Sequence, residues 1–445
     1  MRSASTSTGS SFAARRAGLL AATAAWTGVG VALYLLAPLV APVLLPLSLV
    51  APLGWHWAAH GRFPDLGVSP LLAALAVAAI YLLINATWSL SPASAYSAAF
   101  SFIAVVLVVY FISGALWHLD DDVLRAMALG LYAAVVIGGI LLLFEVASSQ
   151  GLRRLVMSIV PGARPHARDM VIGAGGAMLP APYLLNRSMA ALTLMLWPAL
   201  LATKLLADSP KHHKLMLLGL LPTVAAIIFS AHATSKLALL GGLVLFGLGL
   251  VAFTAARNVA VVSWVAAILL VVPLAYSVYT NQLYAAPWLF QSAQARVAIW
   301  GHTSQQVLKA PVLGSGIASA RALHDPQAAP LAPGSAHARL TTGLHSHNAY
   351  LQTWYETGAV GAALLLAIGI LIVRLCEGLS GGVRAYLLAL FGTCALLEAS
   401  SFSMWAPWLL SSLGLTAAFA TLGCALAAGR TQAYVANARP GLRAS

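Results

Sequence analysis

Charged residues are scarce in this chain. Only 8% of its 445 residues are Asp, Glu, Lys or Arg, whereas a soluble protein has about 25%. Hydrophobic residues make up 60% of the sequence, and they recur in runs of about 20 residues, long enough to cross a bilayer as helices. The composition therefore excludes an ordinary soluble domain and predicts an all-α polytopic membrane protein.

Acidic residues are the rarer charged kind, with 11 Asp and Glu against 24 Lys and Arg. Hard cations such as Mg²⁺ need several converging carboxylate oxygens, and no pair of acids has a spacing useful for such a site. Hydrolysis by a pair of carboxylates is disfavoured for the same reason. We expect neither a metal ion nor another cofactor.

Cysteine is also rare, and its positions limit the chemistry. The three cysteines lie in or beside the last three hydrophobic segments, so a disulfide-stapled loop or a thiolate metal site is disfavoured. Nucleotide-binding glycine loops and the HExxH zinc motif are absent from the sequence. The net charge of +13 is dispersed over many short segments, and we therefore expect no nucleic-acid partner.

Hydropathy predicts about twelve membrane-spanning helices. The second contains Pro42, Pro46 and Pro52, so we expect it to be broken or tilted. The first follows Arg15 and Arg16 and is too long for the apolar core of a signal peptide, which predicts an uncleaved span. The predicted spans cover about residues 17–36, 38–53, 69–87, 97–117, 125–147, 189–207, 214–231, 236–255, 259–279, 355–374, 384–403 and 408–428.

Loop charges predict the orientation of these spans. With the N-terminus in the cytoplasm, the short inner loops carry Lys or Arg, while most outer connections carry no charge. Both termini are then cytoplasmic. The chain divides into residues 1–279, with nine spans; residues 280–354, a long and partly helical outer loop; and residues 355–445, with three spans and a short tail.

Two outer loops depart from this rule because they are basic. Arginine matches phosphate with two parallel hydrogen bonds, so such loops indicate a phosphorylated lipid or a pyrophosphate. Attraction to anionic headgroups and arginines that reach the interface from helix ends are alternatives. The loop at about 148–188 carries Arg153, Arg154, Arg164, Arg168 and Arg187, and the loop at about 280–354 carries Arg296, Lys309, Arg321 and Arg339.

The second basic loop ends in a histidine pair. His345 and His347 stand beside Asn348, where the loop meets a membrane-spanning pattern. Histidine titrates near neutral pH, which suits general acid–base catalysis. Ser346 and Asn348 are also good capping residues, so capping of the following helix is an alternative. The outer face thus offers histidine as a base and arginines as anion ligands.

Three separate segments carry a family resemblance. Residues 186–190, NRSMA, resemble the pattern N-R-x-x-A at the start of a span. Residues 295–300, ARVAIW, with residues 311–316, PVLGSG, resemble R-x-x-x-W followed by P-x-x-G-x-G. Residues 345–361 resemble H-x-H-N-x-Y-L-x-x-x-x-E-x-G-x-x-G. In this order they resemble the O-antigen ligase and O-antigen polymerase superfamily of bacterial membrane glycosyltransferases.

This resemblance implies a GT-C-like enzyme of the bacterial inner membrane with a periplasmic active site, surrounded by membrane lipids. For an O-antigen ligase of lipopolysaccharide biosynthesis, the implied donor is O-antigen linked to undecaprenyl diphosphate and the acceptor is lipid A-core. We favour the ligase because the C-terminal tail is short, whereas protein-glycosylating relatives often carry a large C-terminal domain. An O-antigen polymerase, a protein O-oligosaccharyltransferase and, from another class, a transporter of lipid-linked glycans or organic anions are alternatives.

The residues and the resemblance together suggest a metal-independent, inverting glycosyl transfer. Because His347 and Asn348 match the H-N pair of the motif, His347 is the first choice for the base, and Asn348 would orient its ring. His345 and His337 are the second and third choices. Pyrophosphate binding is assigned to Arg187 and Arg296, with help from Arg164, Arg168 and Arg339.

Overall fold

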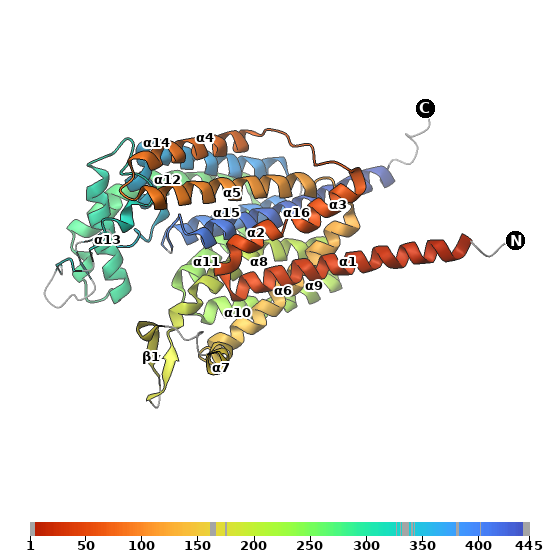
Figure 1. Cartoon of the computed structure of the whole chain (residues 1–445), viewed down its shortest axis with the longest axis horizontal. Coiled ribbons are helices and arrows are strands. Elements are labelled where there is room, and N and C mark those ends of the chain that lie inside the picture. The colour runs from red at the N-terminus through yellow and green to blue at the C-terminus, as the bar shows by residue number, and fades with distance from the viewer. Residues whose placement is uncertain are drawn as a thin grey trace. The chain divides into compact units, whose positions relative to one another are not determined.

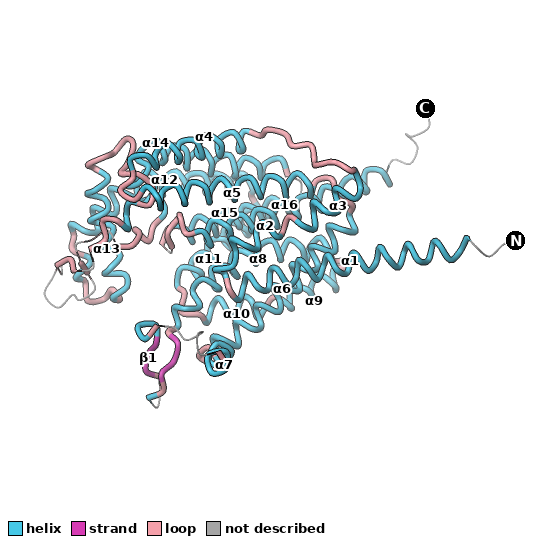
Figure 2. The backbone as a smooth tube through the Cα atoms, in the orientation of Figure 1, coloured by secondary structure: helices cyan, strands magenta, loops and turns pink. Residues whose placement is uncertain are grey.

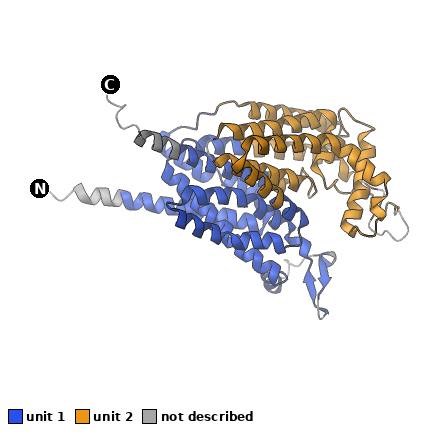
Figure 3. Cartoon of the chain, turned by 180° about the vertical axis from the view of Figure 1, so that it is seen from behind, with its two compact units in different colours: residues 1–66, 108–239, 412–445 blue, residues 67–107, 240–411 orange. Residues whose placement is uncertain are grey.

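The computed structural model describes residues 5–160, 166–173, 176–325, 327–329, 331, 338–339, 341, 343–379, 382–400 and 402–438, and the side chains of all these except 5–12, 168 and 430–438. Two compact units divide the chain (Figure 3). Unit 1 comprises Met1–Leu66, Val108–Leu239 and Ser412–Ser445, and unit 2 comprises Gly67–Leu107 and Leu240–Ser411.

Helices account for nearly all of the regular structure in unit 1 (Figure 1). Three helices continue across the unit boundaries, namely α5 (Pro92–Leu116), α11 (Ala233–Val251) and α16 (Pro407–Ala438). The elements of unit 1 are α1 (Ser5–Leu36), η1 (Pro38–Val40), α2 (Ala41–Leu47), α3 (Val50–His60), α6 (Asp121–Ala147), α7 (Gly151–Ile159), η4 (Ala167–Asp169), β1 (Met170–Ile172), β2 (Met178–Pro180), η6 (Pro182–Leu185), α8 (Asn186–Leu206), α9 (Pro210–Gly219) and α10 (Leu221–Phe229).

Unit 2 is likewise helical. Its elements are α4 (Pro70–Asn85), η2 (Ala86–Trp88), α12 (Phe253–Thr280), η7 (Leu283–Ala285), α13 (Gln291–Val307), η8 (Ser319–Arg321), α14 (Ala349–Leu375), η9 (Cys376–Gly378) and α15 (Val383–Glu398). The shared helices are α5 (Pro92–Leu116), α11 (Ala233–Val251) and α16 (Pro407–Ala438).

The prediction of an all-helical polytopic membrane protein is confirmed. Among the described residues, 11 helical segments are long and apolar enough to cross a membrane. The predicted span 384–403 corresponds to α15, which has 16 residues and, at about 1.5 Å per residue, is shorter than the hydrocarbon core of about 30 Å. The predicted loop 148–188 contains an element that hydropathy does not reveal, the antiparallel hairpin of β1 and β2 (Figure 2).

The second predicted span is interrupted, as its prolines indicate. Three short helices, η1, α2 and α3, make up the segment Pro38–His60. Pro46 lies inside α2, which ends one residue later, and α3 begins at Val50. Proline cannot donate the hydrogen bond that would continue the preceding turn, and an interrupted span agrees with this.

Small residues allow close helix packing in unit 1. A Cβ atom on Gly130 of α6 would lie 2.2 Å from the carbonyl oxygen of Ala24 in α1, so the two backbones are in direct contact. Such approaches are typical of helices that associate within membranes. At one end of this pair, Arg16 of α1 forms salt bridges of 2.8 and 2.9 Å to Asp120 and Asp122.

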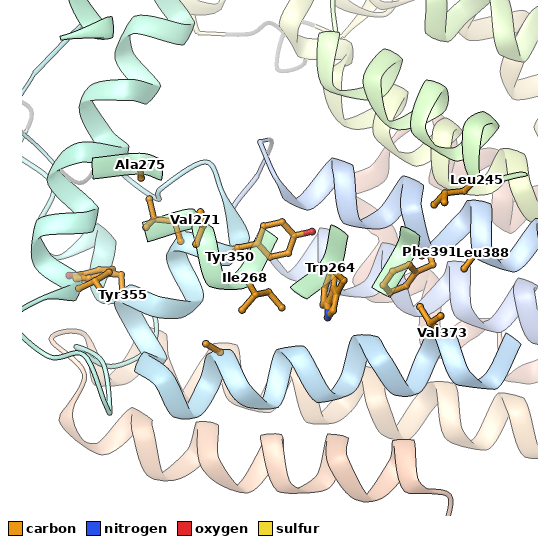
Figure 4. Close-up of a cluster of buried hydrophobic side chains, with 14 of the residues drawn as sticks. Leu245, Trp264, Ile268, Val271, Ala275, Tyr350, Tyr355, Val373, Leu388 and Phe391 are labelled. Atoms are coloured by element: carbon orange, nitrogen blue, oxygen red, sulfur yellow. The ribbon is translucent and has the colours of Figure 1, made fainter. Parts of the chain in front are cut away.

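The core of unit 2 lies where α12, α14 and α15 meet. Trp264 of α12 stands between Tyr350 of α14 and Phe391 of α15, with ring centroids 5.4 and 5.3 Å away (Figure 4). The Tyr350 hydroxyl donates to the carbonyl of Ala395 at 2.6 Å, and the Trp354 indole donates to that of Ile268 at 2.7 Å. These contacts hold the start of α14, and with it the histidine pair, on a packed support.

Candidate active site

The histidine pair lies directly before α14 in unit 2. The ring centroids of His345 and His347 are 4.0 Å apart, with an interplanar angle of 45°. His347 has a φ of 54°, in the left-handed region that side chains other than glycine adopt infrequently. Backbone strain of this kind concentrates at functional sites. The segment therefore presents two imidazoles in one tightly turned stretch.

Three hydrogen bonds hold this turn in place. The Trp300 indole of α13 donates to the carbonyl of Ser346 at 2.8 Å. The Ser346 hydroxyl donates to the carbonyl of Asn348 at 2.8 Å. Oδ1 of Asn348 accepts from the backbone N–H of Leu351 at 3.0 Å, which is the capping interaction that the sequence allowed as an alternative. The cap fixes the start of α14 at Ala349, two residues after His347.

Arg296 lies on the face of α13 that is turned toward this segment. Arg296, Ile299 and Trp300 are spaced three and four residues apart, so they share one side of the helix. Trp300 contacts Ser346, and a Cβ atom on Gly343 would lie 3.0 Å from Cδ1 of Ile299. The structure thus brings Arg296 to the same side of α13 as the loop that carries both histidines.

The Arg296 side chain is half-buried and has no hydrogen bond or ion pair to any residue within the described part of the chain. Burial lowers the pKa of its guanidinium, because the charged form loses hydration that no acid replaces. Buried cations in proteins are normally paired. This guanidinium is therefore a candidate ligand for an anion that the protein itself does not supply.

The other predicted phosphate ligands have varied positions. Arg339 lies in the same loop as the histidines, and its Nη1 donates to the carbonyl of Ala328 at 2.9 Å. Arg187 is the second residue of α8, in unit 1, and is exposed. Arg168 belongs to η4, but its side chain lies outside the described atoms. Arg164 and His337 lie outside the described residues.

At a break in α14, the glycine motif of residues 311–316 contacts the motif of residues 345–361, which contains Glu356. Gly358 has φ 61° and ψ −162°, which interrupts the helix. The carbonyls of Tyr355 and Glu356 accept from the N–H groups of Ser315 and Gly316, each at 2.9 Å. Each motif thus satisfies backbone groups of the other.

Glycine is required at two of these positions. A Cβ atom on Gly358 would lie 2.3 Å from the carbonyl oxygen of Val312, and one on Gly316 would lie 2.3 Å from the Cα of Ser89. Gly316 also has a φ of 90°, which disfavours other side chains. The loop can therefore approach both α14 and Ser89, the residue that follows η2, at backbone contact distance.

Residues at the end of α4 complete this arrangement, and sequence reasoning did not assign them. Asn85 is fully buried; its amide donates to the carbonyl of Leu313 at 3.0 Å, and its Oδ1 accepts from the N–H of Ile317 at 2.7 Å. The Tyr81 hydroxyl donates to the carbonyl of Thr357 at 2.7 Å. The available signal was an isolated asparagine in an apolar span, because polar groups there are costly without a partner.

Glu356 is fully buried and is surrounded by donors. Its carboxylate accepts from the N–H of Ala320 at 3.2 Å, from the Gln352 amide at 3.3 Å and from the Trp405 indole. Trp405 belongs to the connection between α15 and α16, which sequence reasoning also left unassigned. Glu356 therefore joins three segments of unit 2 and acts as a structural anchor behind the histidine turn.

Comparison with known proteins finds a family that this region resembles. Residues 218–366 match the O-antigen ligase family. The match includes α13, the histidine pair and the break in α14, so the resemblance inferred from the motifs is confirmed for this part of the chain. The match begins at residue 218 and therefore does not include Arg187.

A relative supports the same assignment. A curated protein of Rickettsia conorii (strain ATCC VR-613 / Malish 7), named "Putative polysaccharide ligase", is 27% identical over 243 residues. The alignment covers 52% of this chain and 56% of that protein, so the chain spans about half the length of the relative. Both comparisons thus point to proteins described as ligases, and 11 segments of the described part of this chain are long and apolar enough to cross a membrane.

Proposed function

We propose that the protein is an O-antigen ligase that transfers O-antigen from undecaprenyl diphosphate to a sugar hydroxyl of lipid A-core. The observation that carries the proposal is Arg296, a half-buried guanidinium without a partner among the described residues. It lies on the α13 face beside the histidine turn, inside the segment that matches the ligase family. A diphosphate-linked donor supplies the anion that such a group requires.

The proposed reaction is an inverting displacement. His347 accepts the proton of the acceptor hydroxyl as its oxygen attacks the anomeric carbon of the donor. The bond between that carbon and the diphosphate oxygen breaks, and undecaprenyl diphosphate leaves with the bonding electrons. Arg296 stabilises the negative charge that develops on the leaving oxygen, and such stabilisation is usually the largest catalytic term. The His345 ring, 4.0 Å from that of His347, limits the orientations open to the base.

The remaining assignments have different support. Arg339 lies in the histidine-bearing loop and would add positive charge there. Arg164 and Arg168 are assigned to pyrophosphate because they belong to the predicted basic loop, and Arg187 because it also lies in the N-R-x-x-A motif. Arg187 can be tested independently of unit 2. The site is proposed to face the periplasm of the bacterial inner membrane, with both termini cytoplasmic.

Reconstitution tests the proposal. Purified protein in lipid vesicles would be supplied with undecaprenyl-diphosphate-linked O-antigen and lipid A-core, and the products separated on a gel. A ligase yields lipid A-core joined to the polysaccharide. Longer lipid-linked chains without use of lipid A-core would indicate a polymerase, and polysaccharide on an added protein acceptor would indicate a protein O-oligosaccharyltransferase. Movement of unchanged donor across the vesicle membrane would indicate a transporter.

A further inference from the structure

Helix α7 lies at one end of a membrane-spanning helix. α6 ends at Ala147 and α7 begins at Gly151, and so short a connection reaches no more than about 14 Å. In Figure 1, α7 is seen along its axis while α6 is seen from the side, so α7 runs across the direction of the span. A helix in this position lies at the boundary between hydrocarbon and water.

The joint between the two helices is fixed by buried polar side chains. Gln150 has a φ of 63°, and its amide donates to the carbonyls of Pro180 and Ala181, each at 2.9 Å. Its Oε1 accepts from Arg153 at 2.7 Å. Glu145 is buried and accepts from the N–H of Leu152 at 2.6 Å. These bonds determine the direction of α7 and which of its faces is turned outward.

The outward face of α7 is apolar. Leu155, Val156 and Ile159 fall on one side of the helix by their spacing, and they are 56%, 50% and 70% exposed. Met157 lies on another side and is buried. Arg154 and Ser158 are exposed on the flank between these two sides. The helix is thus amphipathic, but its apolar side is turned away from the protein.

This apolar face continues the lipid-facing surface of α6. Ile137, Ile140 and Phe144 of α6 are about half exposed, at 52%, 51% and 50%, as expected for side chains that face hydrocarbon. A Cβ atom on Gly151 would lie 3.2 Å from the Phe144 ring. The exposed apolar side chains of α6 therefore extend to the start of α7, and the occupant that covers the span is membrane lipid.

We propose that α7 is an interfacial membrane helix that inserts Leu155, Val156 and Ile159 into the acyl chains of the leaflet at this end of α6. Arg154 and Ser158 lie at the level of the headgroups. Amphipathic helices with basic residues on the polar side bind membranes in this way. The hairpin of β1 and β2 lies at the same end of unit 1 (Figures 1 and 3), and Gln150 ties it to the joint. The inference does not depend on the proposed enzymatic activity.

Site-directed spin labelling of the full chain in phosphatidylcholine–phosphatidylglycerol vesicles tests the proposal. Cysteines would be placed singly at positions 154, 155, 156, 158 and 159 in a background with Cys376, Cys394 and Cys424 replaced. Labels at 155, 156 and 159 should collide with oxygen more than with a water-soluble nickel chelate, and labels at 154 and 158 should show the reverse. Preference for the nickel chelate at all five positions, or shielding from both reagents at 155, 156 and 159, would overturn the proposal.

A second measurement keeps all three native cysteines. Ser158→Cys and Ile159→Cys would be treated in vesicles with a water-soluble maleimide, and the signal of the unsubstituted chain subtracted. Ser158→Cys should react at least about tenfold faster, because a thiol within hydrocarbon rarely forms the reactive thiolate. Equal labelling of these neighbouring positions would contradict an inserted apolar face. Because these two variants keep the native cysteines, they test the proposal even if the cysteine-free chain does not fold.

Discussion

At the scale of single residues, the backbone of His347 determines how its role can be tested. Its φ of 54° would strain an alanine, whereas asparagine tolerates this region of backbone conformation. The asparagine amide also cannot accept a proton as imidazole does, so this substitution removes the base without straining the backbone. We expect His347→Asn to retain its insertion and melting temperature but to lose about 10²–10⁴-fold in transfer rate, measured with purified enzyme. His345→Asn is the matched comparison. If His347→Asn transfers at a nearly normal rate and His345→Asn is inactive, the base is His345 and not His347.

Arg296 should depend on its guanidinium geometry and not on charge alone. Arg296→Lys keeps the charge but cannot form two parallel bonds to a phosphate, so we expect initial transfer rates to fall by about tenfold or more. Arg321→Lys is the control, because Arg321 is an exposed arginine of the same loop and should retain nearly full rates. The resemblance predicts a similar loss for Arg187→Lys. Full activity of both Arg296→Lys and Arg187→Lys would indicate bulk electrostatic attraction instead.

At the scale of elements, the break in α14 depends on one residue. Gly358→Ala would place a Cβ atom 2.3 Å from the carbonyl oxygen of Val312 at a φ of 61°, and backbone strain alone costs about 1–3 kcal/mol. We expect a lower melting temperature in detergent and a loss of transfer. Gly378→Ala is the matched control because nothing lies within 4 Å of its added Cβ atom. Equal melting temperatures for both variants would show that α14 adjusts to the substitution.

The contact between α4 and the loop of residues 311–317 should be equally sensitive. Asn85→Ala removes the partner of the Ile317 N–H, at 2.7 Å, and of the Leu313 carbonyl, at 3.0 Å; each buried group left unsatisfied costs about 1–3 kcal/mol. We expect a clear fall in the midpoint of thermal unfolding. Asn281→Ala, at an exposed amide bonded to Ser277, should change it little. A fall of the same size in both variants would remove Asn85 from this structural role.

At the scale of the whole molecule, the sequence predicted what depends on local composition. Apolar runs located the spans because each must satisfy its own backbone in hydrocarbon, and the prolines of residues 38–60 predicted their interruption. α15 was predicted too long, since hydropathy continues beyond the residue at which its helix ends. The motifs predict Arg296 and the histidine pair as site residues, which stays a prediction, and they do not reveal how the segments that carry these residues are supported.

The contacts of Asn85 and Tyr81 could not be read from the sequence for a physical reason. Their partners are backbone carbonyls and an N–H group more than 200 residues away along the chain. Every residue carries a carbonyl, so the identity of Leu313 or Thr357 gives no sign that it is an acceptor. Side-chain patterns report local structure, and such long-range backbone contacts require the fold.

Catalysis by the whole protein is expected to be independent of divalent metal. The two acids of the predicted outer loops have partners in the structure: Asp169 accepts from the Tyr183 hydroxyl at 2.6 Å, and Asp325 accepts from the N–H of Gln327 at 2.8 Å. Arginine can neutralise a diphosphate without a metal. Transfer by purified enzyme should therefore persist in excess EDTA, and Asp169→Ala should reduce it only mildly. Loss of activity in the chelator, restored by magnesium or manganese, would contradict the arginine–histidine mechanism, because magnesium held by a carboxylate and the donor phosphates would then supply the charge assigned to Arg296.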